Sequence, residues 1–95
     1  MRKVIYNDLS SGCFFLSYNA MRKFSKLGYK FCEDIPRHHP LLISLYETDK
    51  EDLEGIGCSL KMKEVKGSVY TIIQVQYGKE EVMEPEDFSW TILTS

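Results

Sequence analysis

The side chains best suited to chemistry are three cysteines and two histidines, Cys13, Cys32, Cys58, His38 and His39. Cys32 and one histidine could begin a zinc site, but a fourth ligand is not evident and neighbouring histidines point in different directions on most backbones. A cysteine nucleophile needs a base within hydrogen-bond reach that a third group orients, and no spacing in the chain indicates one. We therefore expect no catalytic residue, no metal and no cofactor. A hydrolase that uses Cys58 or His38 is a third, separate alternative.

A glycine turn before a helix is the second candidate for a site. Backbone N–H groups at the start of a helix can receive an anion, and nearby basic residues would add charge. We expect the ligand-binding residues to be those of the turn, the helix start and the polar groups folded onto them: Gly12, Phe14, Ser17, Tyr18, Arg22, Arg37 and His38. The alternative is that Gly12 only supplies backbone geometry, since the phosphate-loop and dinucleotide-loop patterns are both missing.

Two helices are predicted to position these residues. Ser17 can cap the first helix, whose apolar stripe is formed by Ala20, Met21, Phe24 and Leu27, with Gly28 as a left-handed stop. Pro40 fits the first position of the second helix, and His39 would cap or solvate its start. The buried stripe of that helix is Leu42, Leu45 and Tyr46, and Asp49 can cap a further turn.

Strands are predicted before and after the helices. Residues 4–6 form a short first strand, and beyond Gly57 the hydrophobic period becomes two. One face of the longest segment carries Val69, Thr71, Ile73, Val75 and Tyr77, and the other carries Tyr70, Ile72, Gln74 and Gln76. Further strands are expected at residues 81–83 and 88–92. The predicted fold is α+β in a single domain, 1–95: an N-terminal strand, two helices and a C-terminal antiparallel β-meander of three to four strands.

Charge and composition limit the classes of molecule that this chain is expected to bind. The 95 residues have a net charge of −2 and a pI near 5.6, which argues against direct nucleic-acid binding. The first 40 residues carry seven basic and three acidic side chains, and the rest carry five and eleven, so a basic and an acidic region are expected. An odd number of cysteines predicts a reducing compartment. We expect no signal peptide and no membrane span, and a homo-oligomer is possible because so small a core is thinly stabilised.

Short motifs along most of the chain resemble a family of small bacteriophage proteins. The similar segments are Lys3-Val4-Ile5-Tyr6-Asn7, then Phe15-Leu16-Ser17 after a glycine loop, then residues 35–42 and 59–65, and a glutamate-rich hairpin followed by Trp90. Ser11-Gly12 stands where the family has paired glycines, and His39 stands where an aspartate is common. The resemblance implies a phage or prophage origin and action in the cytoplasm of an infected host.

These observations together predict a non-enzymatic binding protein for host takeover or anti-defence. It would act by stoichiometric capture of a small anionic, nucleotide-like signal. The alternative is a protein-interaction inhibitor whose acidic segments, residues 47–54 and 80–87, dock on a basic surface of a host defence protein.

Overall fold

The computed structural model describes residues 2–67 and 69–85 of the chain. Its elements, in order, are β1 (Arg2–Asn7), α1 (Tyr18–Ser25), a 3-10 turn (Cys32–Asp34), α2 (Pro40–Leu53), β2 (Leu60–Val65), β3 (Thr71–Gln76) and β4 (Lys79–Met83). The predicted α+β class is therefore confirmed: one strand, two helices, then antiparallel strands. The strand predicted at 88–92 lies outside the described residues.

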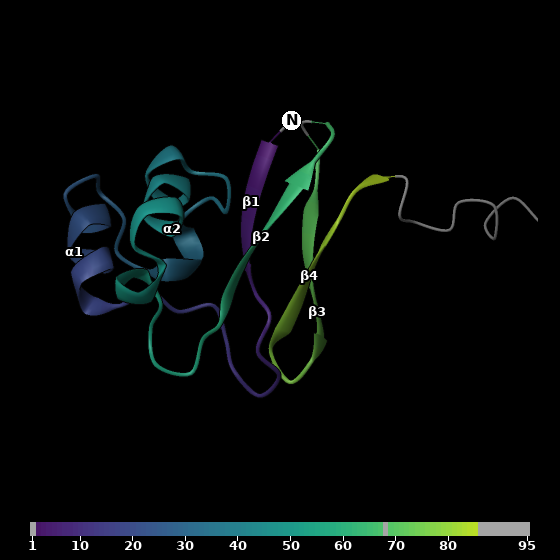
Figure 1. The fold of residues 1–95 in the computed structure, drawn as a ribbon, viewed down its shortest axis with the longest axis horizontal. Helices are drawn as coiled ribbons and strands as arrows, with labels where there is room; N and C mark the ends of the chain where they lie inside the picture. Colours follow the sequence, from purple (N-terminus) through teal and green to yellow (C-terminus); the bar gives the residue numbers. More distant parts are fainter. Residues whose placement is uncertain (1, 68, 86–95) are drawn as a thin grey trace, which may run out of the picture.

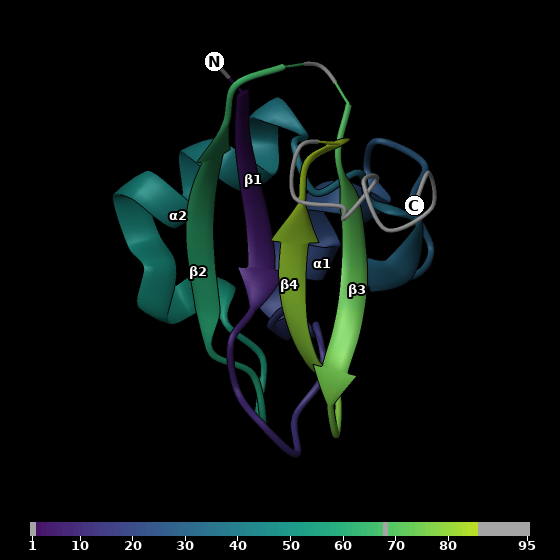
Figure 2. The ribbon, with the colours of Figure 1, turned by 90° about the vertical axis from the view of Figure 1, so that its right-hand side faces the viewer.

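The four strands lie side by side in the order β2, β1, β4, β3, with both helices behind them (Figure 2). Antiparallel ladders join β1 to β2 and β3 to β4, which makes two two-stranded sheets. A consecutive meander would pair β2 with β3. Here the helical segment brings β2 back beside β1, so that Asn7 pairs with Leu60 and Arg2 with Val65. Figure 1 shows the helices on the side of β1 and β2, with the β3–β4 hairpin farther from them.

The capping residues predicted from the sequence begin both helices. The Ser17 hydroxyl accepts a hydrogen bond from the backbone N–H of Ala20 at 3.1 Å. His39 Nδ1 accepts one from the N–H of Leu41 at 3.1 Å, with Pro40 in the first helical position. α2 kinks at Asp49, whose φ and ψ are −156° and 63°. The last turn of α2 therefore starts where the sequence predicts a further capped turn.

One residue of the predicted α1 stripe lies outside the core. Ala20 and Phe24 are buried, but Leu27 is exposed. The helix ends at Ser25 and the chain turns through Gly28, whose φ is 98°. Leu27 thus belongs to the turn, and its side chain no longer follows the helical stripe.

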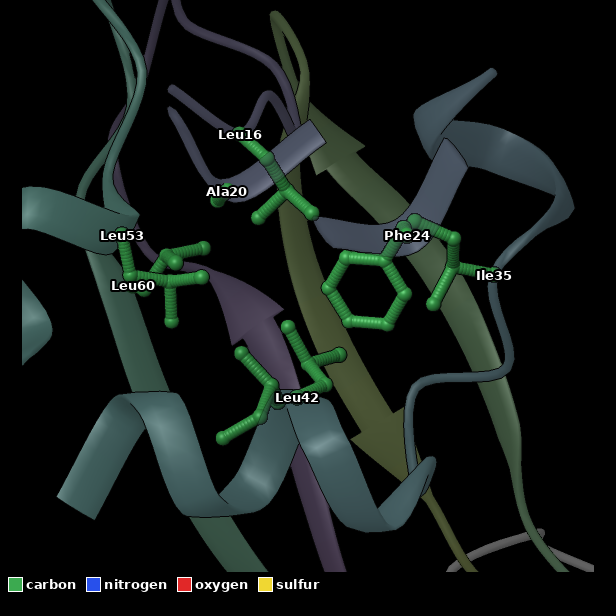
Figure 3. Packing of buried hydrophobic residues seen from close by; sticks show 8 residues of the cluster. Leu16, Ala20, Phe24, Ile35, Leu42, Leu53 and Leu60 are labelled. Carbon is green, nitrogen blue, oxygen red and sulfur yellow. The ribbon is translucent and has the colours of Figure 1, made fainter. Parts of the chain in front are cut away.

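The larger core cluster lies between the helices and the β1–β2 sheet, with Phe24 and Leu42 near its centre (Figure 3). A smaller cluster, Val4, Val65 and Val82, joins that sheet to the hairpin. The larger cluster therefore links the helices to the β1–β2 sheet, and the smaller one links that sheet to the β3–β4 hairpin. No helix in residues 2–67 or 69–85 has the length and apolar character needed to cross a membrane.

Candidate functional site

The most apolar hollow of those described lies at the start of α1. It has a volume of about 480 Å³ and is lined by Phe15, Leu16, Ser17, Tyr18, Met21, Glu54, Gly55 and Ile56. The Tyr18 ring is 78% exposed and the Ile56 side chain 97%. We call this hollow the α1 recess. Exposed aromatic and aliphatic groups around a concave surface are typical of a binding site.

Backbone contacts between two loops build the recess. The N–H of Gly55 donates to the carbonyl of Phe15 at 2.8 Å, and the N–H of Ser17 donates to that of Leu53 at 2.9 Å. A Cβ at position 55 would lie 2.3 Å from the Phe15 ring and 2.7 Å from its carbonyl oxygen. Only glycine allows the two loops to approach this closely. Leu16 points from the same segment into the core (Figure 3), so the recess rests on the rigid part of the domain.

A basic surface adjoins the recess. Two smaller hollows share lining residues with it or with each other, and their cationic members are Arg22, Lys23, Lys26 and Lys30. The Arg22 guanidinium lies 6.0 Å from the centre of the Tyr18 ring. Within residues 2–67 and 69–85, no carboxylate forms an ion pair with these four side chains. We call these four side chains the basic face of α1, although Lys26 and Lys30 follow the last residue of the helix. Asp52 is the one acidic residue that lines either hollow.

Three of the predicted site residues, Ser17, Tyr18 and Arg22, meet at this place. Ser17 caps the helix and also donates its hydroxyl to the Asp52 carbonyl. Tyr18 separates the apolar recess from the basic face, because it lines the recess and the neighbouring hollow that contains Arg22. A ligand with a flat apolar part and a negative part would match this order of groups.

Arg37 and Phe14 lie together at a different place. The Arg37 guanidinium lies 3.6 Å from the centre of the Phe14 ring. It donates two hydrogen bonds to Glu80, at 2.6 and 2.8 Å. The two charged side chains are only 16% and 5% exposed. Glu80 therefore already supplies the anion that Arg37 binds, and the N–H of Asn7 donates to the same carboxylate at 2.8 Å.

His38 and Gly12 occupy two further environments. His38 Nδ1 lies 2.6 Å from the Tyr70 hydroxyl, and burial, followed by the charges of Arg2 and His39, lowers the pKa of its ring. A neutral ring adds no charge to an anion site. A Cβ on Gly12 would come within 2.3 Å of the Gly57 carbonyl oxygen. Gly12 thus allows close packing of two backbone segments, in line with the alternative that this glycine supplies backbone geometry.

The recess contains residues that the sequence analysis did not assign to a binding site, among them Phe15, Met21, Gly55 and Ile56. Phe14 and Phe15 are neighbours in an extended segment, so their side chains point to opposite sides. This alternation is the signal that could have placed one of the two rings on the outside, without telling which one. Ile56 stands between two glycines, a pattern typical of a turn that displays its side chain.

Cys58, Cys32 and His39 lie in environments that do not favour catalysis or metal binding. Burial raises the pKa of the Cys58 thiol, which disfavours the thiolate that a nucleophile needs. Cys32 Sγ accepts a weak hydrogen bond from the N–H of Leu16 at 3.5 Å, and His39 caps α2. In the described part of the chain, no group of three or more His, Cys, Asp or Glu side chains could hold a metal ion.

Several carboxylates of the acidic half are engaged within the chain. Four accept hydrogen bonds or ion pairs from described residues: Glu47 from Lys3, Glu54 from the amide of Leu60, Glu80 from Arg37 and Glu84 from the amide of Lys66. Glu80 and Glu84 are also buried. These four side chains contribute to the fold and offer little free charge to a partner.

Searches of protein-family models, of curated proteins and of solved structures find no match to this chain.

Proposed function

We propose that the protein is a non-enzymatic binding protein that captures a small anionic ligand with a planar apolar part, of the nucleotide class, at the start of α1. The observation that carries the proposal is the adjacency of three features on one surface: the apolar α1 recess, the exposed Tyr18 ring and a basic face that has no ion pair with the described residues. The resemblance to bacteriophage proteins suggests that this capture serves host takeover or anti-defence in the cytoplasm of an infected cell.

The base and the phosphate of such a ligand would contact different side chains. A base can stack on Tyr18 or occupy the apolar surface between Phe15 and Ile56. A phosphate would then reach Arg22, whose guanidinium can donate two parallel hydrogen bonds. Of the two arginines predicted to bind the ligand, Arg22 keeps that role in this proposal, because Glu80 already neutralises Arg37.

Docking of the acidic half on a basic protein has less support. Within residues 47–54 and the described part of 80–87, the carboxylates of Glu47, Glu54, Glu80 and Glu84 have partners inside the chain, which leaves Asp49, Glu51, Asp52 and Glu81 as the remaining acidic residues, all of them exposed. A surface that mimics nucleic acid needs carboxylates that are free in water. We therefore favour capture of an anion.

Isothermal titration calorimetry with mononucleotides, dinucleotides and cyclic dinucleotides tests this proposal. We expect one of them to bind with an affinity that falls as salt rises, because part of the attraction is a screened charge contact. Tyr18→Ala and Arg22→Gln should each weaken binding by about tenfold, the equivalent of 1.4 kcal/mol. Absence of heat with every nucleotide at high micromolar protein would refute the proposal.

Two matched variants show whether the effect belongs to the site. Tyr77→Ala removes an equally exposed ring at the β3–β4 turn, and Lys61→Gln removes an exposed cation on β2. Both should bind like the unmodified protein. If they weaken binding as much as the α1 variants do, the attraction is non-specific and the recess is not the site.

A further inference from the structure

The two outer strands of the layer differ sharply in charge. β2 and β3 stand at its two ends (Figure 2), and within residues 2–67 and 69–85 neither has a strand on its outer edge. β2 carries Lys61, Lys63 and Glu64 among its six residues. β3, with the sequence TIIQVQ, carries no charged residue. Natural sheets protect an edge with charged side chains, especially lysine, or with bulges. β3 has no charged side chain, and its bulge lies between Gln74 and Gln76, beside the β3–β4 turn, so residues 71–74 keep a regular edge.

The exposed face of β3 is also its more apolar one. Tyr70 and Ile72 pack on the small cluster beside β1 and β2. Ile73, next to Ile72 in the regular part of the strand, faces away from the cluster and is 37% exposed. Val75, at the bulge, is 41% exposed, and Val69 just before the strand is exposed as well. An open edge and an apolar face therefore coincide on one strand.

The hairpin that bears this edge has a small anchorage. Its buried apolar contribution is Val82, supported by Tyr70 and Ile72, and its main polar link is the Glu80–Arg37 pair. A two-stranded hairpin is marginal alone and gains stability when further strands extend it. Addition of a strand to β3 would supply both backbone hydrogen bonds and cover for the apolar face.

We infer that β3 is a self-association edge, at which a second copy of this chain adds its own β3 antiparallel about a two-fold axis. The occupant is a second copy because the strand is self-complementary: it meets its own image without opposing like charges. The product is a continuous four-stranded sheet, β4–β3 of one chain with β3–β4 of the other. Ile73 of both copies would lie on its open face, with Val75 at the bulge near each end of the new pairing.

Analytical ultracentrifugation of the full chain across a wide concentration range tests the inference. We expect a reversible monomer–dimer equilibrium that persists at about 1 M salt, where the screening length is about 3 Å, because no ion pair holds the edge. Hydrogen exchange of residues 71–76 should slow as concentration rises, while exchange in β2 should not change.

Charge placed on the edge should separate the copies. Ile73→Lys and Val75→Lys put like charges close together across the two-fold axis and should weaken the dimer by at least about tenfold. Leu27→Lys is the matched control, an exposed apolar residue in the turn after α1, and should leave the dimer intact. Circular dichroism checks that all three variants fold.

Two results would overturn the inference. One is a dimer that survives both lysine substitutions. The other is a monomer at all concentrations; a shift of the emission of Trp90, the one tryptophan, in Ile73→Lys would then assign the edge to the chain's own residues 86–95. Neither result bears on ligand capture at α1, so the two proposals can fail separately.

Discussion

Arg37 and Glu80 join the helical half to the hairpin by a largely buried ion pair. The guanidinium spans both carboxylate oxygens, and Asn7, itself fully buried, donates its backbone N–H to the same group. The Asn7 side chain continues the network to the carbonyl oxygen of Gly78 at 3.1 Å. No buried side-chain polar atom in the described residues lacks a partner. Because so little water reaches the pair, each charge depends on the other.

Removal of one member should therefore cost much more than loss of a surface pair. We expect Arg37→Met to lower the free energy of unfolding by about 3–5 kcal/mol, since Glu80 stays buried without its cation. Lys3→Met, which breaks the exposed pair with Glu47, should cost less than about 1 kcal/mol. Urea unfolding measures both. Arg37→Met with Glu80→Gln should recover part of the loss, and equal effects of the two single variants would contradict this account.

His38 should make stability depend on pH. Burial lowers the pKa of its ring below 6.5, its ordinary value. The folded protein therefore favours the neutral ring, and the unfolded chain binds the proton more readily. The contribution of the neutral His38 ring to the free energy of unfolding is complete above pH 6.5. It is lost as the pH falls toward and through the lowered pKa of the folded protein. Urea unfolding between neutral pH and about pH 5 measures the loss, and His38→Gln should remove it. A parallel pH profile in His38→Gln would exclude His38 as the cause.

At the scale of the elements, α1 depends on contacts that begin outside it. Ser17 is the only residue that both caps the helix and bonds to the end of α2, through the Asp52 carbonyl, among the contacts described. The eight-residue helix is too short to be stable alone. Tyr18 and Arg22 therefore take their positions from this cap and from the burial of Ala20 and Phe24.

Loss of the Ser17 hydroxyl should weaken both the helix and the recess. Ser17→Ala is expected to lower stability by about 1 kcal/mol, the usual value of a cap. It should also reduce affinity for the proposed nucleotide ligand, because Tyr18 begins the loosened turn and Arg22 lies one turn after it. Ser17→Thr keeps the hydroxyl and serves as the control. Thermal unfolding and calorimetry measure the two effects, and a Ser17→Ala protein with unchanged stability would show that the cap is dispensable.

Local rules explain which elements the sequence could predict. The two helix starts depend on the cap residue and its immediate neighbours, so Ser17, His39 and Pro40 were assigned correctly. The pairing of β1 with β2 joins residues more than fifty positions apart, and no local pattern encodes it. The recess was missed for the same reason: Phe15 meets Gly55 only after α2 has folded back. Alternation on β3 likewise defined two faces but not which one is exposed.

At the scale of the whole molecule, the charge asymmetry of the sequence has two different outcomes. Basic residues of the first half remain free on α1, within the part of the chain described. Several acidic residues of the second half are used to attach the strands: Glu80 holds the hairpin to Arg37, and Glu84 accepts from the amide of Lys66. The basic part of the sequence therefore stays on the surface of the described chain, whereas part of the acidic half is used inside the fold.

Unequal anchorage predicts that the hairpin opens before the rest of the domain. The larger cluster holds eight buried residues between the helices and the β1–β2 sheet, whereas the smaller one holds three. Opening of β3 and β4 exposes chiefly Val82 and the Glu80–Arg37 pair, so it should require less free energy than global unfolding. We expect native-state hydrogen exchange, at a concentration that keeps the chain monomeric, to show earlier exchange in residues 71–83 than in β1 and β2.

Arg37→Met supplies the control for this order of opening, because it cuts the polar link without touching the larger cluster. It should speed exchange in residues 71–83 by more than in α1, β1 or β2. A rise in protein concentration should act in the opposite sense, since pairing of β3 with a second copy closes the same segment. If all strands exchange together under each condition, the domain unfolds as one cooperative unit, and the ion pair then stabilises the whole molecule equally.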